Sequence, residues 1–233
     1  MYDARMHSTD VIATMASKTI TGTRRQKRTL RVPSPDRKGN IKVPAEGWIN
    51  AAKVALIEEG IAAVKIDRLA QRLKVSRGGF YHHFKSPHVM LEALLQDWQL
   101  NNRFTPATQD TSTVAATLKS FRELTSNLVH DRGFDPQYDL AIREWARISQ
   151  PVADIVHAVD EQRIDTLRRL YSGFGYKPKD ALIRARVMYW HQIGYYSIGV
   201  QESVDEREKN LGTYLEVLGG DKYVAAVLAA KKG

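Results

Sequence analysis

The sequence predicts an all-α protein in which a small three-helix domain precedes a larger helical bundle. From Pro44 onward, apolar residues recur at the i, i+3, i+4 and i+7 positions that mark one face of a helix. Breaks at Gly60, Asp131–Gly133, Ser172–Gly175 and Gly219–Gly220 divide this pattern into helix-sized segments. No stretch shows the strict alternation of a half-buried strand.

Length and composition limit the classes of protein that this chain can represent. Its 233 residues suit one or two domains, and 43% hydrophobic residues are enough for a core. The absence of cysteine excludes disulfides and thiolate metal sites. No run approaches the roughly 18 apolar residues that cross a membrane, and the first residues do not resemble a signal peptide. We therefore expect a soluble, cytoplasmic protein with no membrane contact.

The positive charge is concentrated in the first part of the chain. Residues 1–43 hold ten Lys and Arg against three Asp and Glu, a net charge of +7, and residues 44–88 add +3. The remaining residues have a net charge of −1. This asymmetry favours a polyanion as the partner of the front of the chain. Residues 1–43 also lack an apolar period, which predicts a disordered basic arm.

Residues 44–88 predict three short helices. The first carries Ile49, Ala52 and Leu56, and the second is a two-turn stripe over Ile66–Leu73. Ser76 can cap a third segment, Arg77–Phe84, and Ser86–Pro87 is a good start for the long helix that follows.

Two short helices separated by a three-residue turn make a helix-turn-helix. The second helix of such a pair fits the major groove of DNA, and the first holds it there. Leu69 and Leu73 lie on the apolar stripe that the holding helix needs, and Phe80 and Phe84 can anchor the reading helix from behind. The small or polar residues Arg77–Gly79 suit the exposed start of the reading helix.

These residues resemble a known family. The runs Ile66–Ala70 and Val75–Ser86, the second of which contains Tyr81 and Phe84 at a fixed spacing, are similar to the DNA-binding signature of the TetR family. The resemblance covers about forty-five residues. The remaining helices of this chain resemble those of the family only in number and length. Lys65 stands where members often have a Thr cap, and Lys74 stands where members usually have Gly in the turn. A left-handed Lys74 costs roughly 1 kcal/mol relative to Gly.

The resemblance implies which residues contact double-stranded DNA. Arg77 is the candidate base reader, because a guanidinium can pair with guanine O6 and N7, while Tyr81 and Lys85 are candidate phosphate contacts. Alternative readings remain: the charges can be plain solvated groups, Tyr81 a core aromatic, and Gly78–Gly79 a loop. The candidate DNA-binding residues are Lys65, Arg77, Gly78, Gly79, Tyr81, His82 and Lys85. Arginines of the arm can also enter a minor groove, or the arm can be a tail that binds nothing in particular.

Residues 89–233 are expected to form a helical effector-binding and dimerisation domain, with helices near 112–130, 136–149, 151–172, 178–200 and 205–218. In the family that the chain resembles, the last two long helices pair with a partner protomer. Here Tyr189, Ile193, Tyr196 and Val200 would supply one apolar edge. Large or polar side chains on these helices are candidates for a pocket that takes a small apolar or aromatic effector, although aromatic residues at helical spacing can equally be core. They are Phe121, Tyr138, Arg143, Trp145, Trp190, His191 and Tyr195.

The function that follows is a homodimeric transcription regulator that reads a palindromic operator. The resemblance favours a repressor that a small effector releases. An alternative is a DNA-binding dimer without a small ligand, controlled by a protein partner or constitutive. An enzyme is the alternative from a different class of protein. The sequence carries no phosphate loop, nucleophile elbow or metal-ligand spacing. We therefore expect no catalytic residues, metal or cofactor.

Overall fold

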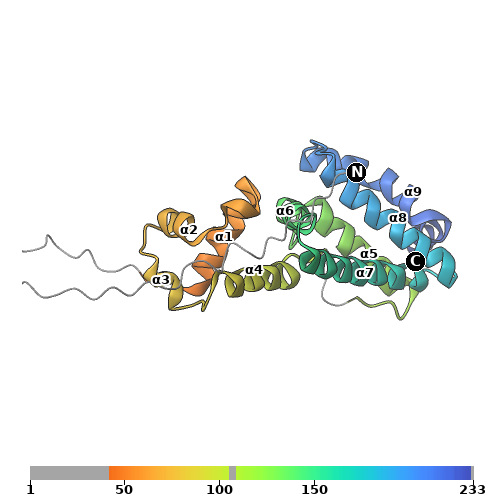
Figure 1. The fold of residues 1–233 in the computed structure, drawn as a ribbon. Helices are drawn as coiled ribbons and strands as arrows, with labels where there is room; N and C mark the ends of the chain where they lie inside the picture. Colours follow the sequence, from red (N-terminus) through yellow and green to blue (C-terminus); the bar gives the residue numbers. More distant parts are fainter. Residues whose placement is uncertain (1–41, 105–108, 232–233) are drawn as a thin grey trace, which may run out of the picture. The chain divides into compact units, whose positions relative to one another are not determined.

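A computed structural model of the chain describes residues 42–104 and 109–231, and all regular secondary structure in these ranges is helical (Figure 1). The all-α prediction is therefore confirmed. The predicted arm, apart from its last two residues, lies outside the described residues. None of the helices in the described part of the chain is both long and apolar enough to cross a bilayer.

The front of the described chain holds four short or medium helices and one 3-10 turn. They are α1 (Ala45–Glu59), η1 (Ile61–Ala63), α2 (Ile66–Leu73), α3 (Gly78–Tyr81) and α4 (Pro87–Asn101). Gly60 ends α1 with a φ of 79°, as its position in the sequence predicts. Ser86 begins α4: its side chain accepts a hydrogen bond from the backbone N–H of Val89 at 3.3 Å, and Pro87 is the first helical residue.

Five longer helices follow. They are α5 (Val114–Val129), α6 (Pro136–Ala146), α7 (Gln150–Gly173), α8 (Pro178–Ser197) and α9 (Val204–Ala230). Polar side chains begin three of them: Thr113 caps α5, Asp135 caps α6, and Ser203 forms a reciprocal capping box with Glu206 at α9. These caps satisfy backbone N–H groups that have no partner within their own helix.

The expected break at Gly219–Gly220 is confirmed at Gly220, but a further helical segment that was not expected follows it, so that α9 resumes and reaches Ala230. Gly220 has φ 74° and ψ −169°, a conformation that favours glycine. The break leaves backbone groups without a partner in the helix, and the hydroxyl of Tyr176 forms hydrogen bonds with two of them. It donates to the carbonyl of Gly219 at 2.9 Å and accepts from the N–H of Lys222 at 3.0 Å. The helix then resumes and buries Tyr223 and Ala226.

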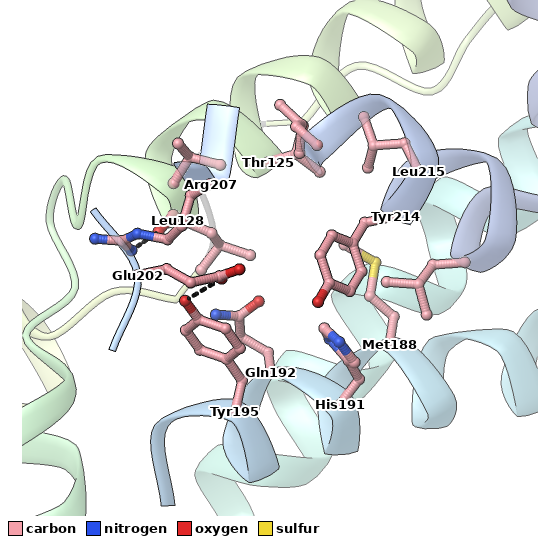
Figure 2. A pocket seen from close by; sticks show the side chains of 13 residues that line it. Thr125, Leu128, Met188, His191, Gln192, Tyr195, Glu202, Arg207, Tyr214 and Leu215 are labelled. Atoms are coloured by element: carbon pink, nitrogen blue, oxygen red, sulfur yellow. Dashed lines mark hydrogen bonds between the residues drawn. The ribbon is translucent and has the colours of Figure 1, made fainter. Parts of the chain in front are cut away.

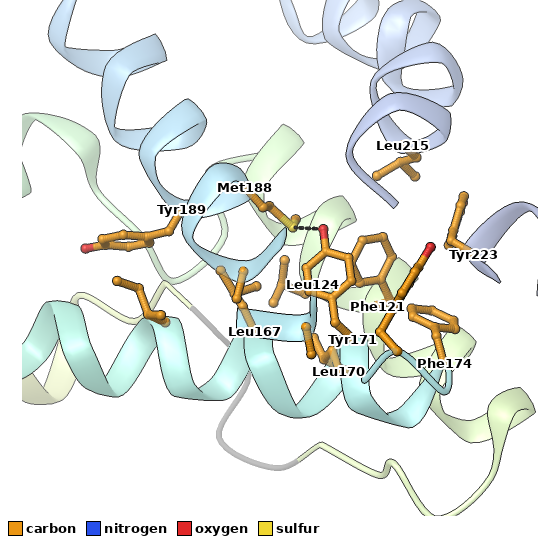
Figure 3. Close-up of a cluster of buried hydrophobic side chains, with 14 of the residues drawn as sticks. Phe121, Leu124, Leu167, Leu170, Tyr171, Phe174, Met188, Tyr189, Leu215 and Tyr223 are labelled. Atoms are coloured by element: carbon orange, nitrogen blue, oxygen red, sulfur yellow. Dashed lines mark hydrogen bonds between the residues drawn. The ribbon is translucent and has the colours of Figure 1, made fainter. Parts of the chain in front are cut away.

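Two clusters of buried apolar side chains hold the helices together. The first joins α1–α4 to α6 and the beginning of α7, and it includes Trp48, Phe80, Trp98 and Tyr138. The second joins α5, the end of α7, α8 and α9 around Phe121, Tyr171 and Tyr223 (Figure 3). Because α6 belongs to the first cluster, the three-helix region does not have a core that is separate from the bundle.

Candidate nucleic-acid interface and regulatory cavity

The short helix α3 is held from behind by aromatic side chains. Phe80 is fully buried and packs edge-on against Trp48 of α1, with ring centroids 5.5 Å apart. Its ring also lies 5.2 Å from that of Phe84. Leu69 and Ala70 of α2 belong to the same buried cluster. The side chains expected to anchor the reading helix therefore have that role, and they leave the opposite side of α3 free.

The turn between α2 and α3 begins with a lysine in the left-handed conformation. Lys74 has φ 56° and ψ 39°. The conformation lets the N–H of Lys74 donate to Gln71 O at 3.1 Å and the N–H of Val75 donate to Ala70 O at 3.0 Å. Two carbonyls at the end of α2 are thereby satisfied. The turn keeps its shape without glycine, at a cost of roughly 1 kcal/mol.

The candidate DNA-binding residues lie around α3, and most are open to solvent. Tyr81 is 53% exposed, so it is not a core aromatic. Gly79 is half-buried, and a Cβ at this position would lie 3.7 Å from Trp48. Arg77 forms an ion pair through Nε with Asp67 of α2 at 3.0 Å, and both side chains are largely exposed. The exposed candidates are Lys65, Arg77, Gly78, Tyr81, His82 and Lys85.

A hydrogen bond ties the chain before α1 to the end of the reading helix. Nε2 of His83 lies 2.8 Å from the carbonyl oxygen of Val43, so the imidazole N–H donates to it. The described chain thus begins beside α3. The sequence gives no signal for this contact, because the partner is a backbone atom forty positions away.

A buried network of charged side chains joins four helices behind this region. Asp139 of α6 accepts hydrogen bonds from Arg143 at 2.8 Å, from Arg163 at 2.9 Å and from the indole N–H of Trp98 at 3.2 Å. Arg163 also donates to the carbonyl oxygen of Asn102 at 3.0 Å. Helices α4, α6 and α7 are therefore connected through one carboxylate that is only 2% exposed.

The network extends to α8 through Arg143. Its guanidinium forms two hydrogen bonds with Asp160 of α7, at 3.0 and 2.7 Å, and one with the hydroxyl of Tyr189 at 2.9 Å. Burial by itself would lower the pKa of Arg143, but the bonds to Asp160 and the charge of Asp139 outweigh it, and the net pKa is raised. Burial also raises the pKa of Tyr189, so its hydroxyl keeps its proton. The sequence singled out Arg143, but its partners could not be identified without the fold.

A cavity of about 70 Å³ lies between α5, α8 and α9 (Figure 2). Its apolar wall comes mainly from Met188 and from leucines of α5 and α9, whereas His191, Gln192, Tyr195, Glu202 and Arg207 supply polar groups. Nδ1 of His191 and Nε of Arg207 are buried there without a hydrogen-bond partner among the described residues. Burial lowers the pKa of His191, which favours a neutral imidazole at neutral pH. Buried polar atoms of this kind are typical of sites that bind a ligand or water.

Only two of the seven predicted effector residues, His191 and Tyr195, line this cavity. Phe121 is fully buried in the second core cluster, and Tyr138 and Trp145 are buried in the first. Arg143 belongs to the charged network, and Trp190 is 59% exposed on α8. The seven residues therefore do not form one pocket. Helical spacing shows that a face is apolar, but not which neighbour covers it.

Apolar side chains are exposed along α8 and α9. Ile183, Val187 and Trp190 follow one another at i, i+4 and i+7 on α8. Ile183 and Val187 border a groove of about 380 Å³ together with Val217 of α9. Of the edge that was expected to face a partner, only Val200 is exposed in the structure. Tyr189 is buried, and Ile193 and Tyr196 pack against the core of their own protomer.

Together, a buried holding helix, a left-handed turn and a short exposed helix form a helix-turn-helix, a motif that in other proteins places its second helix in the major groove of DNA. The described residues contain no group of three or more His, Asp or Glu side chains that could hold a metal ion. The sequence model of the bacterial regulatory proteins of the tetR family matches residues 49–94, which include α2, α3 and the turn. The part of the chain that is similar to the TetR family is therefore this segment of 46 residues.

Individual relatives are more distant. The Transposon Tn10 TetC protein of Escherichia coli is 37% identical over 54 residues, which are 23% of this chain and 27% of that protein. The chain thus matches just over a quarter of this relative. Two solved structures are weakly similar. A transcriptional regulator from Rhodococcus sp. Rha1 has 18% identity and a TM-score of 0.49, covering 80% of this chain and 95% of its own. BioQ with its double-stranded DNA operator has 20% identity and a TM-score of 0.36, covering 76% and 95%.

Proposed function

We propose that the protein is a homodimeric transcriptional repressor that binds a palindromic operator through α3 and leaves it when a small effector binds. The observation that carries this proposal is the exposed face of α3, held by buried Phe80 and Phe84 within a segment that matches the DNA-binding domain of a regulator family. A helix presented in this way fits the major groove.

The residues on and beside α3 support distinct roles in DNA binding. Arg77 can read guanine, because its ion pair with Asp67 uses Nε and involves two exposed side chains. Tyr81 and Lys85 suit phosphate contacts, since both are exposed at the end of α3 and before α4. The backbone at Gly78 and Gly79 allows close approach to DNA.

Dimerisation is supported by the exposed apolar side chains of α8 and α9. A stripe formed by Ile183, Val187 and Trp190 would be covered by the same stripe of a second copy across a two-fold axis. A Cβ added at Gly194 of the same helix would meet no atom within 4 Å, so a partner has room to approach there. Two α3 helices related by this axis would read half-sites about one DNA turn apart.

Effector control is supported by the cavity between α5, α8 and α9 and by the charged network. Ligand binding shifts an equilibrium only if the ligand prefers one state. The network joins α4, which leads out of the DNA-binding region, to α8, one of the helices that carry the cavity and the dimer stripe. A shift of α8 would therefore reach α4 through a chain of hydrogen-bonded side chains.

Selection of genomic fragments tests this function. The purified protein is incubated with fragments at a stated salt concentration without added ligand, and the bound pool is sequenced. We expect enrichment of a palindrome that the double variant Arg77→Ala, Tyr81→Ala loses and that the control Arg132→Ala, an exposed arginine after α5, retains. Binding without enrichment that all three proteins share would contradict recognition through α3.

A further inference from the structure

The cavity between α5, α8 and α9 contains a carboxylate without a cationic partner. Glu202 accepts hydrogen bonds from the hydroxyl of Tyr195 at 2.7 Å and from the side-chain amide of Asn210 at 3.3 Å. Both donors are neutral. Among the described side chains, no ion pair joins Glu202 to a lysine, arginine or histidine. A half-buried carboxylate with neutral donors alone retains an uncompensated negative charge.

The arginine of the cavity does not supply the missing charge. Both terminal nitrogens of Arg207 bind the carboxylate of Asp131, at 3.1 and 2.9 Å, and one also donates to the carbonyl of Leu128 at 3.4 Å. Asp131 thereby neutralises Arg207. His191 is largely neutral at pH 7, because burial lowers the pKa of its imidazole. The lining therefore has a net negative charge at Glu202.

Aromatic rings and apolar side chains complete the cavity. His191 lies 5.2 Å from Tyr214 and 6.5 Å from Tyr195, measured between ring centroids. Tyr195 and Tyr214 are drawn on either side of the space that also holds the Glu202 carboxylate (Figure 2). The faces of such rings attract cations, most strongly where water is excluded. Met188, Leu211 and Leu215 offer an apolar surface beside them.

We propose that this cavity binds a small organic cation, an amine or ammonium group attached to an apolar body. The nitrogen lies at the Glu202 carboxylate and the rings of Tyr195 and Tyr214, and the body lies against Met188, Leu211 and Leu215. This inference rests on the proposed function, since it names the chemical class of the effector. A carboxylate ligand is disfavoured, because it would meet the charge of Glu202, and both terminal nitrogens of Arg207 already bind Asp131.

The size of the cavity limits the ligand. A volume of about 70 Å³ is smaller than the roughly 150 Å³ of an apolar cavity that holds benzene. A short alkylammonium ion fits this space better than a ring system does. The Arg207–Asp131 ion pair and a contact of 3.0 Å between Nε2 of His130 and the Glu208 carboxylate attach the first half of α9 to the end of α5 beside this space.

Three probes of matched size and different charge test the proposal. Butylamine, which is a cation at pH 7, butanol and butyrate are each titrated into the full-length protein without DNA, by calorimetry and by thermal unfolding. A bound ligand raises the unfolding midpoint in proportion to its affinity. We expect butylammonium to bind about tenfold or more tightly than butanol, the strength of a hydrogen bond to a charged group, and butyrate to bind least.

Two variants locate the charge that is responsible. Glu202→Gln keeps the shape and an acceptor for Tyr195, and we expect it to lower butylammonium affinity about tenfold while leaving butanol unchanged. Glu216→Gln removes an exposed carboxylate from α9, the helix that follows Glu202, outside the cavity, and should change nothing. The proposal would be overturned if the three probes bound equally, if butyrate bound best, or if no probe bound. It would also be overturned if Glu202→Gln bound butylammonium as tightly as the unaltered protein does.

The ranking of the probes in the unaltered protein requires no variant, so a folding defect cannot obscure it. The titrations contain no DNA and the fragment selection contains no ligand. Failure of cation binding with a retained palindrome would therefore refute the ligand class alone, and loss of the palindrome with retained cation binding would refute the repressor.

Discussion

The ion pair between Arg77 and Asp67 places the candidate base reader next to a negative charge. Both side chains are more than half exposed, so the pair adds little to stability. Its effect lies in where the guanidinium points. In the DNA complex that we propose, the bases would compete with Asp67 for the Arg77 guanidinium, and the carboxylate would repel nearby phosphates.

We therefore expect Asp67→Asn to raise affinity for the selected operator, by about threefold to tenfold at low salt. Fluorescence anisotropy with operator DNA measures the effect. A double-mutant cycle with Arg77→Ala separates the two causes, since the gain should shrink once Arg77 is absent. An equal gain in both backgrounds would show that Asp67 acts on the DNA alone.

At the scale of the elements, single residues set the turns. Lys74 and Gly220 both lie at breaks with positive φ, but only one of them is a glycine. A lysine in this conformation brings Cβ close to the following carbonyl, whereas glycine has no such contact.

Lys74→Gly should raise the free energy of unfolding by about 1 kcal/mol. Gly220→Ala should lower it by at least about 1 kcal/mol, because the new Cβ meets both a strained φ and the side chains of Arg184 and Tyr176. Urea unfolding of both variants gives the two values. Changes of the same sign would mean that the conformations of these residues do not control stability.

The charged network of Asp139, Arg143, Asp160 and Arg163 is a second feature that connects helices. Arg163 is 94% buried, and its guanidinium lies 5.3 Å from the Trp98 ring and 5.4 Å from the Phe134 ring. Removal of a buried partner leaves a desolvated charge behind, which is far more costly than loss of an exposed pair.

Arg163→Met is accordingly expected to lower the free energy of unfolding by about 3 kcal/mol, since Asp139 loses one of its two cationic partners. Arg168→Met is the matched control on the same helix, because its ion pair with Asp165 is exposed and contributes at most about 1 kcal/mol. Similar losses in the two variants would contradict the importance of burial.

Much of the helical organisation was predictable from the sequence, because caps and glycine stops act locally. Ser86, Thr113 and Asp135 begin their helices through contacts three residues away. The continuation of α9 was not predictable, since it depends on Tyr176, a residue more than forty positions before the break. The cavity was only partly predictable for the same reason: His191 and Tyr195 were candidates, but Glu202 and Arg207 gain their roles only when α5, α8 and α9 pack together.

At the scale of the whole molecule, the proposed dimer and the basic first segment decide how DNA is held. Two weak half-site contacts become one strong contact when the protomers are joined. If the proposal is correct, the exposed stripe on α8 and α9 and the +7 charge of residues 1–43 both strengthen the binding of the operator.

Trp190→Asp should convert the dimer to monomers at micromolar concentration, because a charge at the centre of an apolar interface is desolvated without a partner. Sedimentation velocity measures the outcome. Val114→Asp, which alters an exposed apolar residue at the start of α5, should leave the dimer intact. A dimer that survives Trp190→Asp would place the interface elsewhere.

Deletion of residues 1–41 should weaken operator binding and make its salt dependence shallower. Each phosphate contact that the basic residues make contributes about 0.9 to the slope of log affinity against log salt concentration. Anisotropy titrations at several salt concentrations give this slope. An unchanged slope would mean that the segment binds nothing on the DNA.

The charged network also constrains how this protein can change through descent. Asp139, Arg143, Asp160 and Arg163 satisfy one another, so the loss of any one leaves an opposite charge stranded among buried side chains. Intermediates with a single replacement would be selected against, and viable lineages would replace the residues in matched pairs or retain all four. These four positions should therefore vary together among descendants of this chain, while the exposed residues of α3 remain free to diverge one at a time as operators change.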